Sequence, residues 1–420
     1  MINIISESKS ASKTEINRVR ELAKEYAEYA ASPLMDSRRK AWAEHNAFNF
    51  TRPLIYIRAI PFGEFFDNNA LVCSDNFLRG LEAGFLRAKY RAKICDDYIE
   101  ESYMTVRASV KIPAGGVWGV PAELAVRPAG GGAAAYAPSV NTESDIQKLR
   151  TAPHEIDEAA TQASYNRLAD ILDGILNVHL DRQGALCQMW VNDISTLLAK
   201  LRGLEQIMWD ACDRPEWLHK LLAYMRDGIL KNMDETEAAG DFSYVCHQNQ
   251  AMPYMRGLAA PGGGKAAQSQ LWGYMAAQEF TTFGPDMFDE FMFAYQKPIL
   301  ERYAAVAYGC CEDLTHKIDV IKKLKNLRRI GVSPFADLKK CAEQIGGDYI
   351  LSWRPDPSDM VSRGVDEDRV RKYIRGGIDI MKQNKCVYDI TLKDVETVAG
   401  DAEAIINWTR IVRDEINRAY

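Results

Sequence analysis

Two adjacent cysteines and an acid, Cys310, Cys311 and Glu312, follow an apolar run in this sequence of 420 residues. Thiols and carboxylates at such a position can bind a metal ion or act as general acids. Neighbouring side chains on a strand point to opposite sides, so we expect only one of the two thiols to face a pocket. The alternative for either thiol is an inert, buried packing role.

Polar residues also follow other apolar runs. Glu279 and Glu312 end neighbouring predicted strands, where two carboxylates are costly unless a cation or a proton accompanies them. Salt bridges are the alternative for these glutamates, and a purely structural role is the alternative for the histidines. We predict that the catalytic residues are Glu312, Glu279 and Cys311, and that a metal ion would take Glu279, Cys310, Glu312 and His247. The residues predicted to bind substrate are Asp97, His179, His247, Trp272, Gln278, Tyr308, Trp353 and Asp394.

Short apolar runs alternate with amphipathic helical segments along most of the chain. This alternation predicts parallel strands joined by crossover helices, and in a barrel the carboxyl ends of such strands face one shared mouth. The pattern therefore favours an α/β fold, a (β/α)8 TIM barrel. Nine candidate strands are one more than the barrel needs, so one is misread or belongs to an extension. The predicted strands are residues 54–60, 93–100, 175–180, 244–247, 271–280, 304–311, 327–332, 348–353 and 387–392.

Three segments lie outside this alternation. Residues 12–48 have helical spacing and predict an N-terminal helical extension, so we divide the chain into residues 1–50 and a barrel of residues 51–420. The glycine-rich residues 113–138 and 253–264 predict long loops, because glycine runs are unfavourable inside helices and strands. Long insertions of this kind normally lie over the mouth of a barrel, so we expect at least one of them to form a lid.

Composition narrows the class of protein. With 47% hydrophobic residues the chain can bury a large core, and its net charge of -6 argues against a nucleic-acid partner. The sequence contains no run of 18 apolar residues, so no membrane span is expected. Its nine cysteines include no C-x-x-C pair and lack the dense spacing of a disulfide scaffold, which predicts a reducing, cytoplasmic environment.

Several of these segments together resemble the uroporphyrinogen decarboxylase superfamily, and most closely its branch related to corrinoid-dependent methyltransferases. The resemblance covers the chain from about Pro53 to the C-terminus, and its motifs are specific together and weak singly. It implies the eight-stranded barrel and, for many members, transfer of a methyl group to or from a cobalamin on a separate small protein. The segments that carry it are residues 96–100, 272–279, 308–312, 327–337, 349–357 and 390–397.

Two departures from the superfamily pattern matter. The decarboxylases hold substrate carboxylates with Arg-Gln-Ala-Gly-Arg after their first strand, whereas this chain keeps only Arg58 there, so tetrapyrrole decarboxylation is not expected. The thiol-methylating relatives bind zinc through a His-x-Cys pair and a later cysteine. Here only Cys310 matches the pair, and the later cysteine is replaced near Lys393 or Asp394.

The resemblance implies an enzyme that transfers a methyl group from a small methylated substrate, such as an aromatic methyl ether, to the cobalt of a corrinoid-binding protein. The leaving phenoxide would need a proton, from Glu312 or Glu279, or a zinc ion as Lewis acid, while Trp272, Tyr308 and Trp353 would pack the substrate ring. A homodimer is compatible with this view. The alternatives are a decarboxylase or lyase that uses Arg58, Arg354 and an acid, and a non-catalytic binding or scaffold barrel.

Overall fold

The computed structural model describes residues 12–58, 60–126, 135–243, 250–258, 261–262, 264–358 and 366–420. The strands are β1 (Ile55–Ile57), β2 (Tyr103–Arg107), β3 (Glu123–Val126), β4 (Ala135–Ala137), β5 (Asn177–Asp181), β6 (Trp272–Met275), β7 (Ala305–Tyr308), β8 (Leu327–Val332), β9 (Ile350–Trp353) and β10 (Val387–Leu392). The α-helices are α1 (Lys13–Ala30), α2 (Pro33–Asn46), α3 (Phe62–Phe65), α4 (Asn76–Ile94), α5 (Glu158–Leu172), α6 (Ser195–Arg202), α7 (Leu204–Asp213), α8 (Pro215–Ala239), α9 (Pro285–Phe288), α10 (Ala294–Leu300), α11 (Ile318–Ile321), α12 (Leu338–Ile345), α14 (Glu367–Gln383) and α15 (Ala404–Ala419).

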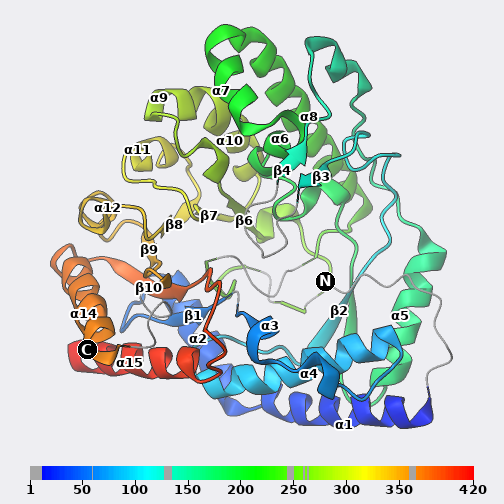
Figure 1. Ribbon diagram of the computed structural model, residues 1–420, viewed down its shortest axis with the longest axis vertical. Helices are drawn as coiled ribbons and strands as arrows, with labels where there is room; N and C mark the ends of the chain where they lie inside the picture. Colours follow the sequence, from blue (N-terminus) through cyan, green and yellow to red (C-terminus); the bar gives the residue numbers. More distant parts are fainter. Residues whose placement is uncertain are drawn as a thin grey trace.

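A parallel six-stranded sheet forms the centre of the fold, in the order β1-β10-β9-β8-β7-β6. It curls into an arc, and α9, α11, α12 and α14 lie along its outer side (Figure 1). Side chains cap two of these helices: Asp337 accepts the Lys340 N–H at the start of α12, and Asp366 accepts the Arg369 N–H at the start of α14. The mixed α/β class with parallel strands is therefore confirmed, and the predicted strands at residues 327–332 and 387–392 match β8 and β10 to the residue.

Two further parallel strands, β2 and β5, form a sheet of their own. Here one prediction is wrong: residues 93–100 are not a strand, because α4 continues to Ile94 and the chain then runs irregularly to β2. Asp96 and Asp97 lie in this irregular segment, and their carboxylates accept the N–H groups of Ile57 and Ile55 at 3.0 and 2.8 Å. Side chains thus satisfy part of the outer edge of β1.

The two glycine-rich segments differ from each other. Within residues 113–138, β3 and β4 pair as an antiparallel hairpin, so this segment is not simply a loop. The described part of the second segment includes Met255 and Leu258, which pack against an apolar cluster at β6 and β7 that includes Cys310. The predicted strand at residues 244–247 lies outside the described residues.

Helix α2 packs into the fold through residues near its C-terminus, where Trp42, His45 and Asn46 are buried. Alternate residues of β10 face opposite sides of the sheet, so Ile390 joins the outer core while Asp389 faces α2. The domain boundary predicted at residue 50 stays a prediction.

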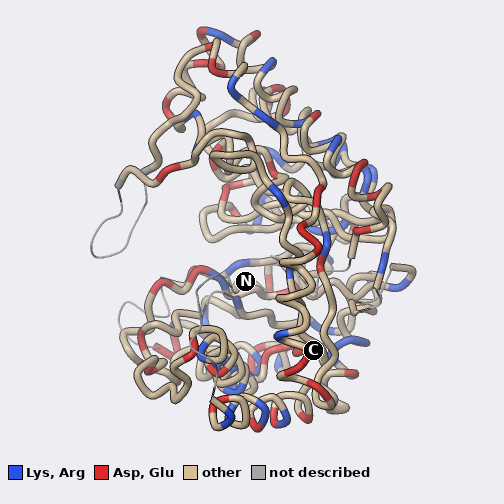
Figure 2. The backbone as a smooth tube through the Cα atoms, turned by 90° about the vertical axis from the view of Figure 1, so that its right-hand side faces the viewer, with Lys and Arg blue, Asp and Glu red and all other residues tan. Residues whose placement is uncertain are grey.

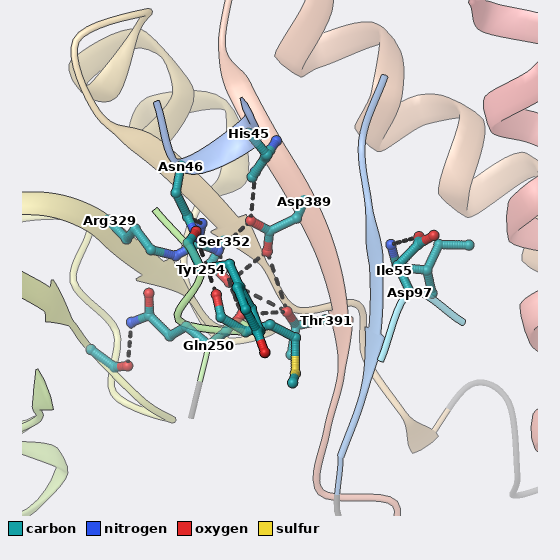
Figure 3. A network of polar contacts seen from close by, with 12 residues as sticks. His45, Asn46, Ile55, Asp97, Gln250, Tyr254, Arg329, Ser352, Asp389 and Thr391 are labelled. Carbon is teal, nitrogen blue, oxygen red and sulfur yellow. Dashed lines mark hydrogen bonds and ion pairs between the residues drawn. The ribbon is translucent and has the colours of Figure 1, made fainter. Parts of the chain in front are cut away.

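A buried polar network connects α2 to three strands (Figure 3). The Asp389 carboxylate accepts hydrogen bonds from His45 Nε2 at 3.1 Å and Ser352 Oγ at 2.9 Å, and it forms an ion pair with Arg329. Arg329 Nη1 in turn donates to Asn46 Oδ1 at 2.8 Å. Removing one member of such a network leaves a buried charge or dipole without its partner, which is costly.

Charged residues of both signs are interspersed along the chain in the view of Figure 2. Within the part of the chain that the structure describes, no helix combines the length and the apolar character that a membrane crossing requires.

Candidate functional site

A pocket of about 620 Å³ lies at the carboxyl ends of β7, β8, β9 and β10. This is the end of a parallel sheet where α/β proteins usually bind ligands. Phe335, which is 76% exposed, forms part of its apolar wall. The pocket is lined by Cys310, Cys311, Pro334, Phe335, Arg354, Asp356, Pro357, Ser358, Lys393, Asp394, Glu396 and Thr397.

The two thiols reach this pocket through a turn after β7. The strand ends at Tyr308, and Gly309 then has a φ of 102°, which strongly favours glycine. Arg354 fixes the turn by donating from Nη1 to the Cys310 carbonyl and from Nη2 to the Gly309 carbonyl at 3.3 Å. Both thiols line the pocket, so the expectation that only one could do so is wrong, because the strand ends before them.

An ammonium group lies among the thiols. Lys393 Nζ is 2.9 Å from Cys310 Sγ, 3.6 Å from Cys311 Sγ and 3.3 Å from Asp394 Oδ2. The two sulfurs are 3.4 Å apart, and Cys311 Sγ donates to Asp394 Oδ2 at 3.1 Å. We refer to Cys310, Cys311, Lys393 and Asp394 as the thiol–lysine cluster.

The charges around the two thiols make them unequal. The contact with Cys311 and the positive charges of Arg354 and Lys393 lower the pKa of Cys310, although burial opposes this. The same contact, together with burial and the charge on Cys310, raises the pKa of Cys311. These opposite shifts favour the thiolate at Cys310 and the protonated thiol at Cys311, an arrangement that suits nucleophilic and proton-transfer chemistry.

Glu312 lies behind the cluster and is only 2% exposed. Its carboxylate accepts the N–H of Cys310 at 2.7 Å and the N–H of Ala277 at 2.9 Å, so it joins the turn after β7 to the end of β6. Burial raises the pKa of Glu312, and the charge on Cys310 adds to this. The structure supports a positioning function for this residue, and its predicted role as catalytic acid stays a prediction.

Glu279 and Gln278 lie in a short 3-10 helix after β6 and are not among the residues that line the pocket. Glu279 accepts a hydrogen bond from Ser195 Oγ at 2.8 Å. Nearby, burial raises the pKa of Asp193 to about 7 and the charge of Glu279 adds to this effect. The two carboxylates predicted to be catalytic, those of Glu279 and Glu312, thus each accept hydrogen bonds from other groups of the protein.

The predicted aromatic residues do not line the pocket. Tyr308 is fully buried, and its hydroxyl donates to Gln296 Oε1 at 2.6 Å. Trp353 packs against Tyr373 and Gly377 of α14, on the outer side of the sheet. Trp272 donates to the Pro253 carbonyl at 2.9 Å and lines a separate cavity of about 60 Å³.

The other predicted residues are dispersed. Asp97 accepts from Ile55 N–H and pairs with Arg413 at 2.9 Å, so it holds the edge of β1. The rings of His179 and Tyr103 form an edge-to-face contact, and both residues line a different cavity, of about 160 Å³. His247 lies outside the described residues. Of the predicted site residues, the structure therefore brings Cys310, Cys311 and Asp394 together at the pocket.

Sequence reasoning missed the role of one residue at this site and the presence of another. Lys393 was named only as a place where the relatives' later cysteine is replaced, although its position at the end of the last strand was a signal for a mouth residue. Trp190, in the segment after β5, has a φ of 68° and places its ring 5.9 Å from Lys393 Nζ and 5.4 Å from the Tyr274 ring. No local pattern in the sequence indicates that Trp190 reaches β10.

The donors at this site do not fit a resident zinc ion. The ammonium of Lys393 already occupies the position between Cys310, Cys311 and Asp394 that a cation would need. Elsewhere within the described ranges, too, no three His, Cys, Asp or Glu side chains are gathered so that they could hold a metal ion.

Two comparisons with known proteins give no match. No family model matches the chain, and no curated protein sequence matches it. The likeness to the uroporphyrinogen decarboxylase superfamily rests on the sequence motifs alone.

Proposed function

We propose that this chain is a methyltransferase component that removes a methyl group from a small methylated substrate, such as an aromatic methyl ether, and delivers it to the cobalt of a separate corrinoid protein. The observation that carries the proposal is the thiol–lysine cluster inside the pocket at the ends of β7 to β10. The motif resemblance supports the corrinoid partner, and the fold supports the position of the site.

Demethylation of an aryl ether leaves a phenoxide, whose conjugate acid has a pKa of about 10 on the tyrosine scale. Such a leaving group needs a proton or a positive charge as the bond to carbon breaks. Lys393 lines the pocket and can supply both, because its ammonium carries a charge and N–H donors. Its contact with Cys311 is the longest of its three polar contacts in the cluster, at 3.6 Å, and a substrate oxygen could replace it.

The other members of the cluster hold Lys393 in place. Its ammonium group contacts the sulfur of Cys310 at 2.9 Å and the Asp394 carboxylate at 3.3 Å. Cys311, held by Asp394, keeps its own proton and offers a second donor. The methyl acceptor belongs to the partner, so this chain binds and orients the substrate and donates the proton.

The pocket walls suit a ring with a polar substituent. Pro334, Phe335 and Pro357 provide apolar surface, while Lys393 and Asp394 add polar groups to the lining. Aromatic surface that remains exposed at a pocket rim can pack on a substrate ring.

The proposal includes a closed (β/α)8 barrel built from the six-stranded sheet together with β2 and β5. Two observations support it. The six strands of the central sheet are parallel to one another and β2 is parallel to β5, and a hydrogen bond of 2.8 Å from Asp97 N–H to the Ile55 carbonyl links the segment before β2 to β1. In such a barrel, β2 and β5 would complete the wall between β1 and β6.

The test measures methyl transfer from methoxylated phenols to free cob(I)alamin by the absorbance of the methylated corrinoid. Wild-type protein should catalyse transfer, and Lys393→Met should lower kcat/KM by at least about 100-fold, the usual contribution of a general acid. Lys382→Met is the matched control, because Lys382 contacts the Ala419 carbonyl far from the pocket. Equal rates for wild-type and Lys393→Met would reject the assigned acid.

The same experiment separates the rival functions. Carbon dioxide release from a carboxylated substrate, with no need for a corrinoid, would favour a decarboxylase. Stable binding of ligand or corrinoid protein without turnover would favour a scaffold. Arg354 gives little support to the decarboxylase, because two of its nitrogens already donate to the Cys310 and Gly309 carbonyls.

A further inference from the structure

We propose that Cys310 and Cys311 form a site of reversible oxidative modification, at which hydrogen peroxide converts the two thiols into a disulfide between adjacent residues. The geometry carries this inference, since the sulfurs are 3.4 Å apart and both line an open pocket of about 620 Å³. Redox-sensing cysteines characteristically combine an accessible thiolate with a nearby resolving thiol. The proposal is independent of the methyl-transfer function.

The surrounding charges favour a different reaction for each sulfur. Cys310 lies next to Lys393 and Arg354, which favour its thiolate, the form that attacks peroxide. Cys311 donates its hydrogen to Asp394, which can accept that proton when Cys311 reacts. Cys310 is 2% exposed, so a molecule as small as hydrogen peroxide suits it better than a large disulfide.

The first step oxidises Cys310. Its sulfur attacks one peroxide oxygen and forms an S–O bond, the O–O bond breaks, and the leaving hydroxide takes a proton from Lys393, which regains one from solvent. The product is a sulfenic acid, and the peroxide has accepted two electrons.

The second step closes the pair. Cys311 passes its proton to Asp394, and its sulfur attacks the sulfur of the sulfenic acid. The S–S bond forms while the S–O bond breaks, and the hydroxyl leaves as water with the proton from Asp394. Overall, two thiols and one peroxide give one disulfide and two water molecules.

A disulfide between neighbouring residues should be easy to reduce. The Cα atoms of adjacent residues are about 3.8 Å apart across a trans peptide bond, which is shorter than the usual separation for bridged cysteines, about 4.4–6.8 Å. Strain of this kind makes a disulfide more reducible and therefore suited to reversible control. Closing it would remove the thiolate that contacts Lys393 and leave Asp394 as its acidic partner in the cluster.

Other cysteines provide controls within the same chain. Burial raises the pKa of Cys341 to about 12 and that of Cys386 to about 11, so both thiols stay protonated. Cys95 and Cys212 are exposed but lie outside the pocket lining. Selective reaction at Cys310 and Cys311 would therefore reflect their surroundings and not exposure alone.

The experiment treats the full chain with hydrogen peroxide and maps the modified peptides by mass spectrometry. We expect the peptide with Cys310 and Cys311 to lose two hydrogen atoms, and dithiothreitol to restore them. In Cys311→Ser the reaction should stop at the sulfenic acid, so dimedone should label Cys310. Lys393→Met should slow the reaction at least about tenfold, because the thiolate loses its cation.

Cys386→Ser serves as the matched variant and should react like the wild type. Circular dichroism confirms that each variant is folded, and the intact pair in wild-type protein tests the proposal without any substitution. The proposal is overturned if peroxide modifies Cys95 or Cys212 while Cys310 and Cys311 keep their hydrogens, or if wild-type protein accumulates a dimedone adduct on Cys310. Because the readout is peptide mass, failure of methyl transfer would leave this test intact.

Discussion

At the scale of single residues, a lysine and two cysteines define the site. Lys393 contacts both sulfurs and Asp394, and Trp190 covers it from the segment after β5. A cation placed in this way among a thiolate and a carboxylate compensates their charges without a metal. The residue that matters most is therefore the lysine, whose position follows from the end of β10.

The pH dependence of thiol alkylation tests this charge arrangement. A thiol with a pKa of about 8.5 loses more than about 100-fold in alkylation rate between pH 8.5 and pH 6. Because its neighbours lower the pKa of Cys310, we expect its reaction with iodoacetamide to slow far less over that range. Peptide mapping after short exposures at each pH gives the rate for each cysteine.

The Lys393→Met variant supplies the control for that profile. Without the ammonium, the alkylation of Cys310 should fall more steeply as the pH decreases. An identical profile in the variant and the wild type would mean that Lys393 does not stabilise the thiolate.

At the scale of secondary structure, the turn after β7 decides what faces the pocket. Gly309 has a φ of 102°, and a Cβ built on it would lie 2.7 Å from Leu314 Cδ1 and 3.2 Å from the Gly331 carbonyl oxygen. The turn thus depends on a residue without a side chain. It also brings Cys310 and Cys311 to one side.

Gly309→Ala should therefore destabilise the protein by about 2 kcal/mol, because a non-glycine residue at this φ and a close contact both cost energy. Urea unfolding measures the change. Gly376→Ala is the matched control, since Gly376 lies in α14 with nothing within 4 Å of the added carbon. That substitution should stabilise by up to about 1 kcal/mol, and equal effects of both would contradict the role of the turn.

Much at this scale could be read from the sequence. Residues 327–332 and 387–392 were predicted as they occur in β8 and β10, because each is a bounded, mostly apolar run. The strand at residues 93–100 was wrong, because the apolar and charged pattern there belongs to the end of α4 and to Asp96 and Asp97. Only one of the two thiols was expected to face a pocket, whereas both line it. Contacts such as that of Trp190 with Lys393 depend on long-range folding that no local pattern encodes.

At the scale of the whole molecule, a buried network joins the N-terminal helices to the sheet. Asp389 binds His45, Arg329 and Ser352, and these belong to α2, β8 and β9. The network lies on the same face of β10 as Thr391, and so holds the strand that directly precedes Lys393. Its integrity should affect the stability of the entire fold.

Asp389→Asn should destabilise the protein by about 3–5 kcal/mol, because Arg329 would stay buried without its charge partner. Chemical denaturation followed by fluorescence gives this value. The control is Glu21→Gln, which removes only an exposed pairing with Lys24 and should cause no measurable change. Similar denaturation midpoints for both variants would show that the buried network contributes no more to the free energy of unfolding than an exposed ion pair does.

His45 predicts how stability depends on pH. Burial lowers the pKa of His45 in the folded protein, so the unfolded chain binds its proton more readily. The stability that the buried, neutral His45 provides is therefore complete above the pKa of histidine in the unfolded chain, about 6.5. It is lost as the pH falls below that value. Denaturation midpoints from pH 8 to pH 5 should decline, and His45→Gln should flatten the decline; an unchanged slope would contradict this assignment.

The fate of an isotopically labelled methyl group tests whether this chain transfers methyl groups to a corrinoid. Wild-type protein would be incubated with a methoxylated phenol that carries a deuterated methyl group and with cob(I)alamin, and the products separated by mass spectrometry. We expect the label on the corrinoid, a free phenol as the second product, and loss of both in Lys393→Met. A substrate that keeps its labelled methyl group while it loses carbon dioxide, or that is bound and returned unchanged, would contradict it.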